Sequence, residues 1–249
     1  MHFCFLSQHI FNLNTGTVEG IRYIQQGIKK TIDCDAVIST IPVPELVKAF
    51  PGYLTKDIMS SAIALKFRSV RFLNILIDQP DISDNAWMYV SEEKYIMTRI
   101  QEPKRLSPFS APEGKTSVML EIPCNENDET RNCPKESLSK RCLADLKELG
   151  IDIQDKAIDY FTTSAIRVYP VYSLDYKMHR QKLFDFLDCY ENLITCGRQG
   201  PFRYVFMDTD MENGTAAAQD IISDNLPKKG DVHLMHPERK LLEVASVTA

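Results

Sequence analysis

One stretch near the C-terminal end constrains the fold of this 249-residue chain more than any other. Residues 192–222 read NLITCGRQGPFRYVFMDTDMENGTAAAQDII, in which a short apolar strand at Leu193–Cys196 runs into a loop containing glycine. Met207 and Asp208 then begin an alanine-rich helix. A helix start has unpaired backbone N–H groups and a partial positive charge. This strand–turn–helix order therefore predicts an α/β fold with a site for an electron-rich or anionic ligand.

The composition is that of an ordinary globular protein and argues against several functional classes. Hydrophobic residues make up 44% and charged residues 25%, and the formal net charge of −5 argues against a general nucleic-acid or membrane-surface binder. The seven cysteines are odd in number and lack C-x-x-C spacing, which indicates free thiols in a reducing, cytoplasmic setting. The five histidines are scattered, so we expect no metal site. The apolar segment MHFCFLSQHIF is too short to span a bilayer and predicts a strand.

The first fifty residues are predicted to form strands followed by a short helix. Valine, isoleucine and tyrosine alternate with polar residues, as in a half-buried antiparallel meander, over residues 9–14, 18–26 and 27–40. Ala36–Ile38 is a continuous apolar run, which is typical of a buried strand. Pro42 ends this strand, and PELVKAF at residues 44–50 is a short helix.

A second block of strands and helices follows. Four strand-like segments, separated by turn residues, are expected at residues 66–78, 85–91, 94–103 and 115–124. A further strand is predicted at residues 158–170 and a helix at residues 175–190. The helix at residues 134–150 has one apolar stripe, made of Leu138, Cys142, Leu146 and Leu149. The last helix has another apolar face, made of Met211, Gly214, Ala218, Ile221 and Ile222.

This order of elements indicates a block inserted between two parts of another domain. We assign residues 1–51 and 171–225 to the outer domain, residues 52–170 to the insertion and residues 226–249 to a tail. The tail is mixed in charge, as a solvated segment would be.

Two segments that bracket the insertion resemble motifs of a known family. DAVISTIP at residues 35–42 is similar to a D-x-V-I-x-T-x-P strand, and residues 197–208 are similar to G-R-x-G-x-[FY]-[RK]-Y-x-x-M-D. Together they resemble the C-terminal half of FAD-dependent amine-oxidase-type flavoproteins, which include protoporphyrinogen oxidase, phytoene desaturases and UDP-galactopyranose mutase. TRIQEPK at residues 98–104 is similar to the mutase pattern Y-T-R-I-x-E-x-K, and residues 169–171 are similar to its Y-P-V segment. The resemblance covers residues 9–225.

The resemblance implies a fold and also a departure from it. The outer domain would be the C-terminal part of an FAD-binding three-layer, Rossmann-like domain, and the insertion a substrate domain of mixed sheet and helix. The G-x-G-x-x-G unit that opens the family's flavin domain has no counterpart among the ten glycines. This implies a truncated or split form. Its partners would then be a small-molecule substrate and either a complementing N-terminal fragment or a second copy that pairs through an open sheet edge.

The resemblance also implies roles for particular residues. Eight residues would bind FAD: Thr40, Pro42, Gly197, Arg198, Arg203, Tyr204, Met207 and Asp208. Two would bind substrate: Arg99 and Tyr169. Without the resemblance, Asp208 would be an ordinary N-cap, either arginine of the loop could form a surface ion pair, its glycines could simply make turns, and Arg99 could equally face solvent. Trp87 is expected in a core, and Glu102 and Lys104 at the surface.

No Ser/His/Asp, Cys/His or paired-carboxylate arrangement stands out, so FAD itself is expected to supply the chemistry. The resemblance implies a flavin-dependent oxidation of a small organic substrate, with hydride transfer to the flavin N5. One alternative is a UDP-galactopyranose mutase-like enzyme, in which the N5 of reduced flavin attacks the anomeric carbon of a nucleotide-sugar. The other is a catalytically silent fragment that needs a separate N-terminal half.

Overall fold

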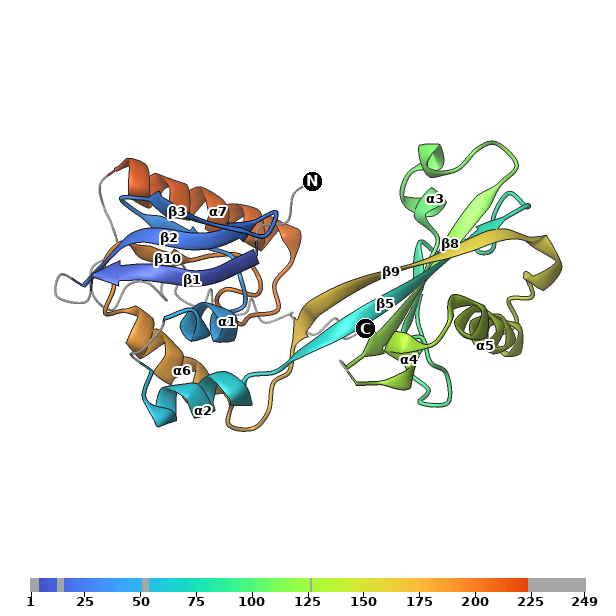
Figure 1. Ribbon diagram of the computed structural model, residues 1–249. Helices are drawn as coiled ribbons and strands as arrows, with labels where there is room; N and C mark the ends of the chain where they lie inside the picture. The colour runs from blue at the N-terminus through green and yellow to red at the C-terminus, as the bar shows by residue number, and fades with distance from the viewer. Residues whose placement is uncertain (1–4, 13–15, 51–53, 126, 224–249) are drawn as a thin grey trace, which may run out of the picture. The chain divides into compact units, whose positions relative to one another are not determined.

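The computed structural model describes residues 5–12, 16–50, 54–125 and 127–223, with side chains from residue 16 onward. The chain divides into two compact units (Figure 1). Unit 1 contains residues 1–66 and 170–249, and unit 2 contains residues 67–169. Sheets and helices occur in both units, which confirms the mixed α/β class.

An antiparallel meander opens unit 1. Strand β1 (Phe5–Asn12) pairs with β2 (Thr17–Gln25), and β2 pairs with β3 (Ile28–Asp33). Gln26 and Gly27 connect β2 to β3 with φ angles of 52° and 77°. Two consecutive positive φ angles match the twist of a two-residue hairpin loop. The predicted meander is confirmed, although its residues 13–14 lie outside the described residues.

A parallel pair of strands forms a second sheet in unit 1. Strand β4 (Val37–Ser39) pairs with β10 (Leu193–Thr195), and Ile38 aligns with Ile194. Helix α7 (Met207–Ile222) follows β10 and covers it with Ala217 and Ile221. The two apolar runs and the helix start at Met207 therefore form the strand–turn–helix unit that the sequence predicted.

Three helices complete the described part of unit 1: α1 (Val43–Lys48), α2 (Lys56–Ala64) and α6 (Tyr176–Leu187). Phe50 packs against Tyr190, with ring centroids 4.8 Å apart. Helix α2 was not predicted from the sequence, because its buried residues are only Ser61 and Ala62 and give no apolar stripe. Helix α2 packs on α6, so unit 1 extends to Lys66, beyond the boundary assigned at residue 51.

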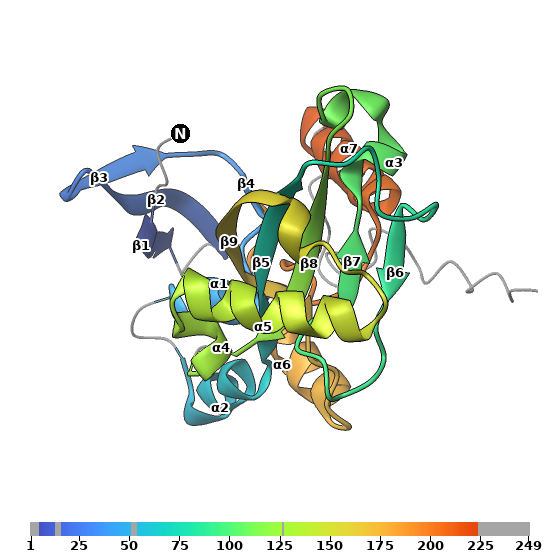
Figure 2. The ribbon, with the colours of Figure 1, turned by 90° about the vertical axis from the view of Figure 1, so that its right-hand side faces the viewer.

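Unit 2 is one five-stranded sheet with a helix on one face. The strands lie in the order β6-β7-β8-β5-β9. Helix α5 (Lys135–Glu148) crosses the sheet (Figure 2), and its Leu138, Cys142 and Leu146 belong to the main core cluster. The strand bounds are β5 (Phe67–Ile77), β6 (Trp87–Tyr89), β7 (Arg99–Gln101), β8 (Thr116–Cys124) and β9 (Ala157–Pro170). The shorter helical segments are α3 (Pro103–Leu106), η1 (Pro108–Ser110), α4 (Glu129–Asn132) and η2 (Gln154–Lys156).

Helix α7 turns a different face to the sheet than the sequence pattern predicted. Ala217 is buried and Ile221 is partly buried, whereas four of the five predicted residues are exposed: Met211, Gly214, Ala218 and Ile222. Successive residues of a helix are about 100° apart, so the apolar face lies beside the buried one. At 16 residues α7 is too short to span a bilayer, and no helix in the described ranges is long and apolar enough to do so.

Candidate functional site

The carboxyl ends of β4 and β10 meet in unit 1, and the loop of residues 196–206 lies on them. Ligands of parallel α/β sheets usually bind at this edge. Thr40 and Pro42 follow β4, and Gly197 follows β10 with a φ of 78°. A Cβ atom added to Gly197 would lie 3.8 Å from Cβ of Thr40. The two motifs that bracket the insertion in the sequence are therefore neighbours in space.

Backbone contacts hold this loop in one conformation. The Cys196 N–H donates to Ser39 O at 2.8 Å, and the Arg203 N–H donates to Arg198 O at 3.1 Å. A Cβ atom on Gly200 would lie only 2.4 Å from Cys196 O. Gly200 is thus required by a close approach of two backbone segments, which no other residue permits without a shift.

Aromatic side chains support the loop from the side of α6. Phe202 is fully buried with a φ of 52°, and its ring lies 6.1 Å from the ring of Tyr172 and 6.3 Å from that of Tyr176. The Tyr204 N–H donates to the Tyr172 hydroxyl at 2.7 Å. A non-glycine residue with positive φ persists only where its surroundings fix it, so this aromatic cluster sets the loop geometry.

The loop leads directly into α7, and the start of this helix has no side-chain cap. Phe206 is the N-cap residue, and its side chain makes no capping hydrogen bond. The first backbone N–H groups of α7 therefore remain available as donors, and the helix dipole adds partial positive charge to them. The side chains of Met207 and Asp208 are exposed at this end.

Arg198 lies between an aromatic ring and a carboxylate. Its guanidinium carbon is 4.0 Å from the centroid of the Tyr204 ring, and its Nη1 donates to Val205 O at 3.5 Å. Asp210 turns inward from the first turn of α7, and burial raises the pKa of its carboxyl while the charge of Arg198 lowers it. Arg203 is exposed, so only Arg198 of the two loop arginines is held in a defined position.

In unit 2, Arg99 and Tyr169 converge on Glu121. Glu121 is buried in β8, forms an ion pair with Arg99 and accepts a hydrogen bond from the Tyr169 hydroxyl. Burial lowers the pKa of Arg99, but the charge of Glu121, a hydrogen bond with Tyr89 and the charge of Tyr169 together outweigh burial, so the pKa is raised. Glu121 was not among the site residues predicted from the sequence. The sequence does contain a sign of its role, because Glu121 is the single carboxylate within the apolar run SVMLEIP. A carboxylate in such a run is expected to be buried, and a buried carboxylate needs partners.

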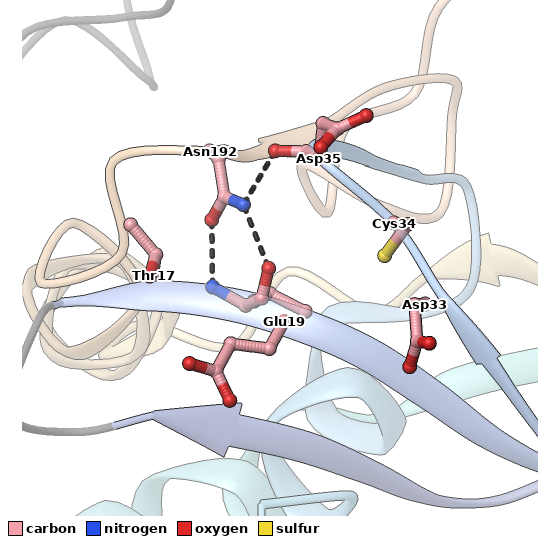
Figure 3. Close-up of a pocket in the computed structure, with 7 residues that line it drawn as sticks. Thr17, Glu19, Asp33, Cys34, Asp35 and Asn192 are labelled. Atoms are coloured by element: carbon pink, nitrogen blue, oxygen red, sulfur yellow. Dashed lines mark hydrogen bonds between the residues drawn. The ribbon is translucent and has the colours of Figure 1, made fainter.

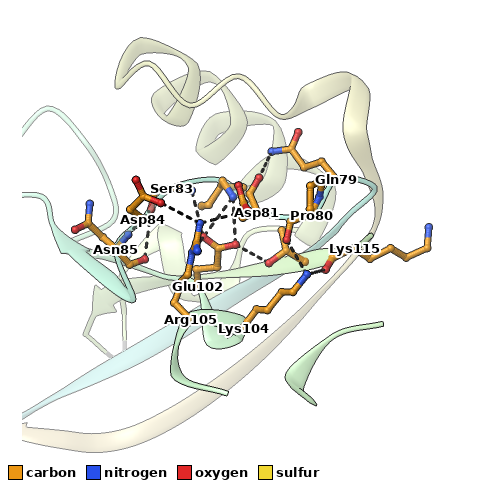
Figure 4. Close-up of polar contacts among 12 residues, drawn as sticks. Gln79, Pro80, Asp81, Ser83, Asp84, Asn85, Glu102, Lys104, Arg105 and Lys115 are labelled. Carbon is orange, nitrogen blue, oxygen red and sulfur yellow. Dashed lines mark hydrogen bonds and ion pairs between the residues drawn. The ribbon is translucent and has the colours of Figure 1, made fainter. Parts of the chain in front are cut away.

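A second buried carboxylate, Glu102, holds the loop before β6 (Figure 4). Glu102 is only 1% exposed, which corrects its predicted surface position. It accepts hydrogen bonds from the Thr116 hydroxyl at 2.7 Å and from the N–H groups of Ile82 and Ser83 at 3.2 and 3.3 Å. These donors are distant in sequence, which is why composition alone could not reveal them.

Two neighbours of Glu102 also differ from expectation. The Lys104 ammonium donates to Pro80 O at 2.8 Å and to Lys115 O at 2.9 Å, so this lysine ties the loop rather than being free at the surface. Trp87 was expected in a core but is 50% exposed on the three-residue strand β6. The strand is too short and too close to the sheet edge to bury it.

A pocket of about 500 Å³ opens at the opposite end of the parallel pair (Figure 3). Asn192 donates to Val18 O at 2.8 Å and Asp35 O at 2.7 Å, and thereby ties the meander to β4. Burial, followed by the charges of Asp35 and Asp33, raises the pKa of Cys34, which disfavours a nucleophilic thiolate. No group of residues in the described ranges could hold a metal ion. The pocket therefore offers acidic walls to a ligand, without an activated thiol.

One Ser/His/Asp set occurs within unit 1, although none was evident in the sequence. Nδ1 of His179 lies 3.1 Å from the Ser61 hydroxyl, and its Nε2 lies 3.2 Å from a carboxylate oxygen of Asp175. Ser61 is fully buried between α2 and α6, so no substrate can reach its hydroxyl. The set fastens two helices together and is not a hydrolytic triad.

Solved structures of flavoenzymes share this fold. The chain is similar to reduced UDP-galactopyranose mutase, with a TM-score of 0.71, 17% identity, and coverage of 92% of this chain and 48% of that one. It is also similar to a provisionally assigned protoporphyrinogen oxidase from Exiguobacterium sp. 255-15 (TM-score 0.59, 18% identity, 83% and 44% covered). An oxidoreductase from Methanosarcina mazei is a further match (TM-score 0.55, 15% identity, 87% and 49% covered).

The chain thus spans about half the length of these solved structures. A comparison with curated proteins gives no significant match. The model of one family, described as flavin containing amine oxidoreductase, matches residues 18–222, which include β4, the loop of residues 196–206 and α7. By this match over most of its length, the chain belongs to the family of flavin containing amine oxidoreductases.

Proposed function

We propose that unit 1 contributes the flavin-ring end of an FAD site and that the chain serves a flavin-dependent oxidation of a small organic substrate. The observation that carries this proposal is the uncapped start of α7 at the carboxyl ends of β4 and β10. Family membership supports the flavin, and the two motifs of the resemblance contribute residues to this edge. The Rossmann-like, three-layer character of the domain is part of the same proposal.

The donors at this edge fit the charge of a flavin. The N1–C2=O edge of the ring gains negative charge on reduction, and backbone N–H groups at a helix start favour such charge. Met207 and Asp208 would supply these N–H groups, while Gly197 would allow the ring to approach the backbone. When bound, the flavin supplies the redox chemistry by accepting hydride from the substrate.

Arg198 would position the flavin, because its guanidinium is already oriented by the ring of Tyr204 and the backbone of Val205. Thr40 and Pro42 would form the neighbouring wall at the end of β4. Arg203 is exposed and would contact the cofactor's phosphates only through a flexible side chain.

Unit 2 would bind the substrate through Arg99 and Tyr169. Glu121 fixes both side chains, and the geometry of a carboxylate pair leaves part of the planar guanidinium of Arg99 able to bind an anionic group. We assign Glu121 as the residue that positions this pair. Its replacement by glutamine should weaken substrate binding without changing the flavin spectrum.

The test of the flavin is direct. The chain is purified from its own cells under native conditions and denatured, and the released cofactor is identified by chromatography; we expect FAD. In a second arm, the Arg198→Gln variant should retain at least about tenfold less FAD, which corresponds to about 1.4 kcal/mol. Lys177→Gln, exposed on α6, is the matched control. Absence of any flavin from the natively purified protein would refute the proposal.

A mutase acting on a nucleotide-sugar is the second candidate function. It is supported by the TRIQEPK segment, which contributes Arg99, and by the fold similarity to UDP-galactopyranose mutase over 92% of the chain. The flavin-loaded protein would be reduced and given UDP-galactopyranose. Isomerisation without net redox change would establish the mutase. Consumption of oxygen or a quinone with another substrate, and no isomerisation, would exclude it.

A further inference from the structure

Strand β9 forms one edge of the five-stranded sheet of unit 2 (Figure 2). It is 14 residues long, and within the described part of the chain β5 is its only strand partner. An open edge presents N–H and C=O groups that can pair with another strand, so natural edges are usually short or protected by lysine and proline. The opposite edge, β6, has three residues, whereas β9 contains no lysine and no proline before Pro170. This edge lies in unit 2, apart from the open edge that the resemblance implies for the outer domain, and it favours addition of a further strand.

Large apolar side chains are exposed along β9. Ile158, Phe161 and Ile166 are 53%, 48% and 53% exposed. Tyr160 packs against the core cluster that includes residues of α5, and Phe161, the next residue of the strand, points to the other face of the sheet. A strand added at this edge would therefore cover apolar surface on both faces while its backbone pairs with β9.

The charges of β9 are complementary when two copies of the strand run antiparallel. Around a twofold axis at Thr163, Asp159 of one copy lies opposite Arg167 of the other, because each is four residues from the axis. Symmetry gives the same pair a second time. Opposite charges on directly opposed residues stabilise an antiparallel pair, whereas like charges destabilise it. The charge pattern therefore matches this strand to its own copy.

The uncharged residues between these two charges are also matched in this register. Tyr160 lies opposite Ile166, and Thr162 lies opposite Ser164. An aromatic residue paired with a β-branched residue, and threonine paired with serine, are both favourable across antiparallel strands. The complementarity therefore runs through the centre of the strand and does not rest on the charges alone.

A shifted register loses this match. Moving the axis by half a residue places Asp159 opposite Ile166. The same shift places Arg167 opposite Ile158, so both charges lose their partners. Regular pairing ends at Arg167, where φ is 56° and the N–H donates to Ser69 Oγ at 3.3 Å. The sequence of the strand thus selects one register.

A second copy of the chain is the occupant that these observations favour. A strand of unrelated sequence would pair with the backbone of β9 but would place opposite charges at residues 159 and 167 only by coincidence. A twofold pairing also uses the edge of both copies, so it closes at a dimer and does not continue into a fibre. We propose that β9 is a self-association surface, through which two copies of the chain join the sheets of their unit 2 antiparallel in the register centred on Thr163. The proposal is independent of the flavin.

An added cysteine tests the register. Directly opposed residues of antiparallel strands have Cβ atoms about 4.5–5.5 Å apart, so Thr163→Cys should cross-link to its counterpart through a short bis-maleimide. Ile158→Cys would lie about ten residues along the strand from its counterpart, or about 34 Å, and should not cross-link. The unsubstituted chain, in which Cys189 is exposed, is the control for native thiols.

The full chain should sediment as a dimer, and mass spectrometry of peptides from the cross-linked dimer should find residue 163 linked to itself. Three results would overturn the proposal: a chain that stays monomeric at every accessible concentration, a dimer without the link at 163, and equal links at 158 and 163. A link from 163 to a different polypeptide alone would do the same.

Charge reversal tests the pairing of Asp159 with Arg167. Asp159→Lys places like charges opposite each other, so the dimer should bind at least about tenfold more weakly at low salt, equivalent to about 1.4 kcal/mol. Adding Arg167→Asp restores opposite charges, and aspartate tolerates the positive φ at this position, so the double variant should regain most of the affinity. Asp155→Lys, at an exposed position before β9, makes the same change of net charge and should leave the dimer intact. Hydrogen exchange of the β8 amides checks that each variant is folded. A folded double variant that binds as weakly as Asp159→Lys would refute the register.

Discussion

Helices α5 and α7 have the same kind of apolar stripe but differ in what covers it. In α5, Leu138, Cys142 and Leu146 are buried on the sheet of unit 2. In α7, the stripe that includes Met211 and Ile222 is exposed, and the sheet contact is made by Ala217 instead. Hydrophobic spacing identifies the face of a helix that prefers an apolar neighbour. It does not say whether that neighbour belongs to the same folded unit.

The largest contrast should appear when one residue of each stripe is truncated. Leu146→Ala removes a fully buried side chain and should lower the free energy of unfolding of unit 2 by about 2–5 kcal/mol. Met211→Ala should change the stability of the free chain by less than about 0.5 kcal/mol. Urea denaturation can be followed for unit 2 by the fluorescence of Trp87, which lies on β6; hydrogen exchange of α7 amides reports on unit 1. A large loss from Met211→Ala would show that the stripe is covered within this chain.

Gly200 and Gly214 allow a second comparison, between a tightly packed position before α7 and an open position within it. Gly200→Ala places a methyl group 2.4 Å from Cys196 O, and we expect it to destabilise the loop before α7 by up to about 3 kcal/mol. Gly214→Ala has open space and should stabilise α7 by about 0.5–1 kcal/mol in the free chain. Hydrogen exchange of the β10 and α7 amides measures both. If Gly200→Ala were neutral, the close packing of the loop on β10 would be refuted.

The parts of the fold that sequence predicted are those set by local signals. Pro134 precedes α5, and Gly150 follows it with a φ of 86°, so both ends of the helix were visible in the sequence. The apolar runs that form β4 and β10 and the start of α7 at Met207 were equally local. Helix α2 was missed because its buried residues, Ser61 and Ala62, are small or polar and make no stripe.

The parts that sequence could not predict depend on contacts between distant segments. Glu102 receives its donors from residues 14 to 20 positions away, and Tyr169 reaches Glu121 across 48 positions. The motifs did predict where the loop and the helix start would lie, but not that Arg198 would be oriented by Tyr204 while Arg203 stays exposed. Roles of individual residues toward FAD and substrate stay predictions that the variants above test.

The buried carboxylates of the two units differ in how fully they are hydrogen-bonded, as the two stripes differ in how fully they are covered. Glu102, in unit 2, has hydrogen-bond donors for both of its oxygens. Glu102→Gln keeps the shape but replaces an acceptor oxygen by an NH₂ group, which leaves the Ser83 N–H without an acceptor when it takes the place of Oε2, at a cost of about 2 kcal/mol. Urea denaturation followed by Trp87 fluorescence measures the loss, with the exposed Glu113→Gln as control. Similar stability of both variants would mean that the network does not hold the loop before β6.

Asp210, in the first turn of α7, is the less satisfied carboxylate and should give the smallest effect. Its Oδ1 is buried without a hydrogen-bond partner in the described structure, and burial, opposed by the charge of Arg198, raises its pKa above 3.8. Between the unfolded and the higher folded pKa, the folded state binds more protons, so stability falls as pH rises through this window. The carboxyl is partly exposed, so the loss should be below about 1 kcal/mol.

Asp210→Asn removes the titrating group and should flatten this part of the pH dependence, whereas the exposed Asp208→Asn should leave it unchanged. The measurement is the exchange of α7 amides as a function of pH, from below 3.8 to neutrality. At neutral pH the substitution Asp210→Asn loses the attraction between the carboxylate and the charge of Arg198, which opposes the gain from no longer burying a charge. The stability of α7 in the two variants should therefore differ little at neutral pH. If the stability of α7 depended on pH just as strongly in Asp210→Asn, the pH dependence would arise from another group. A flattened slope would show that α7, unlike α5, begins with a polar group that its own unit does not satisfy.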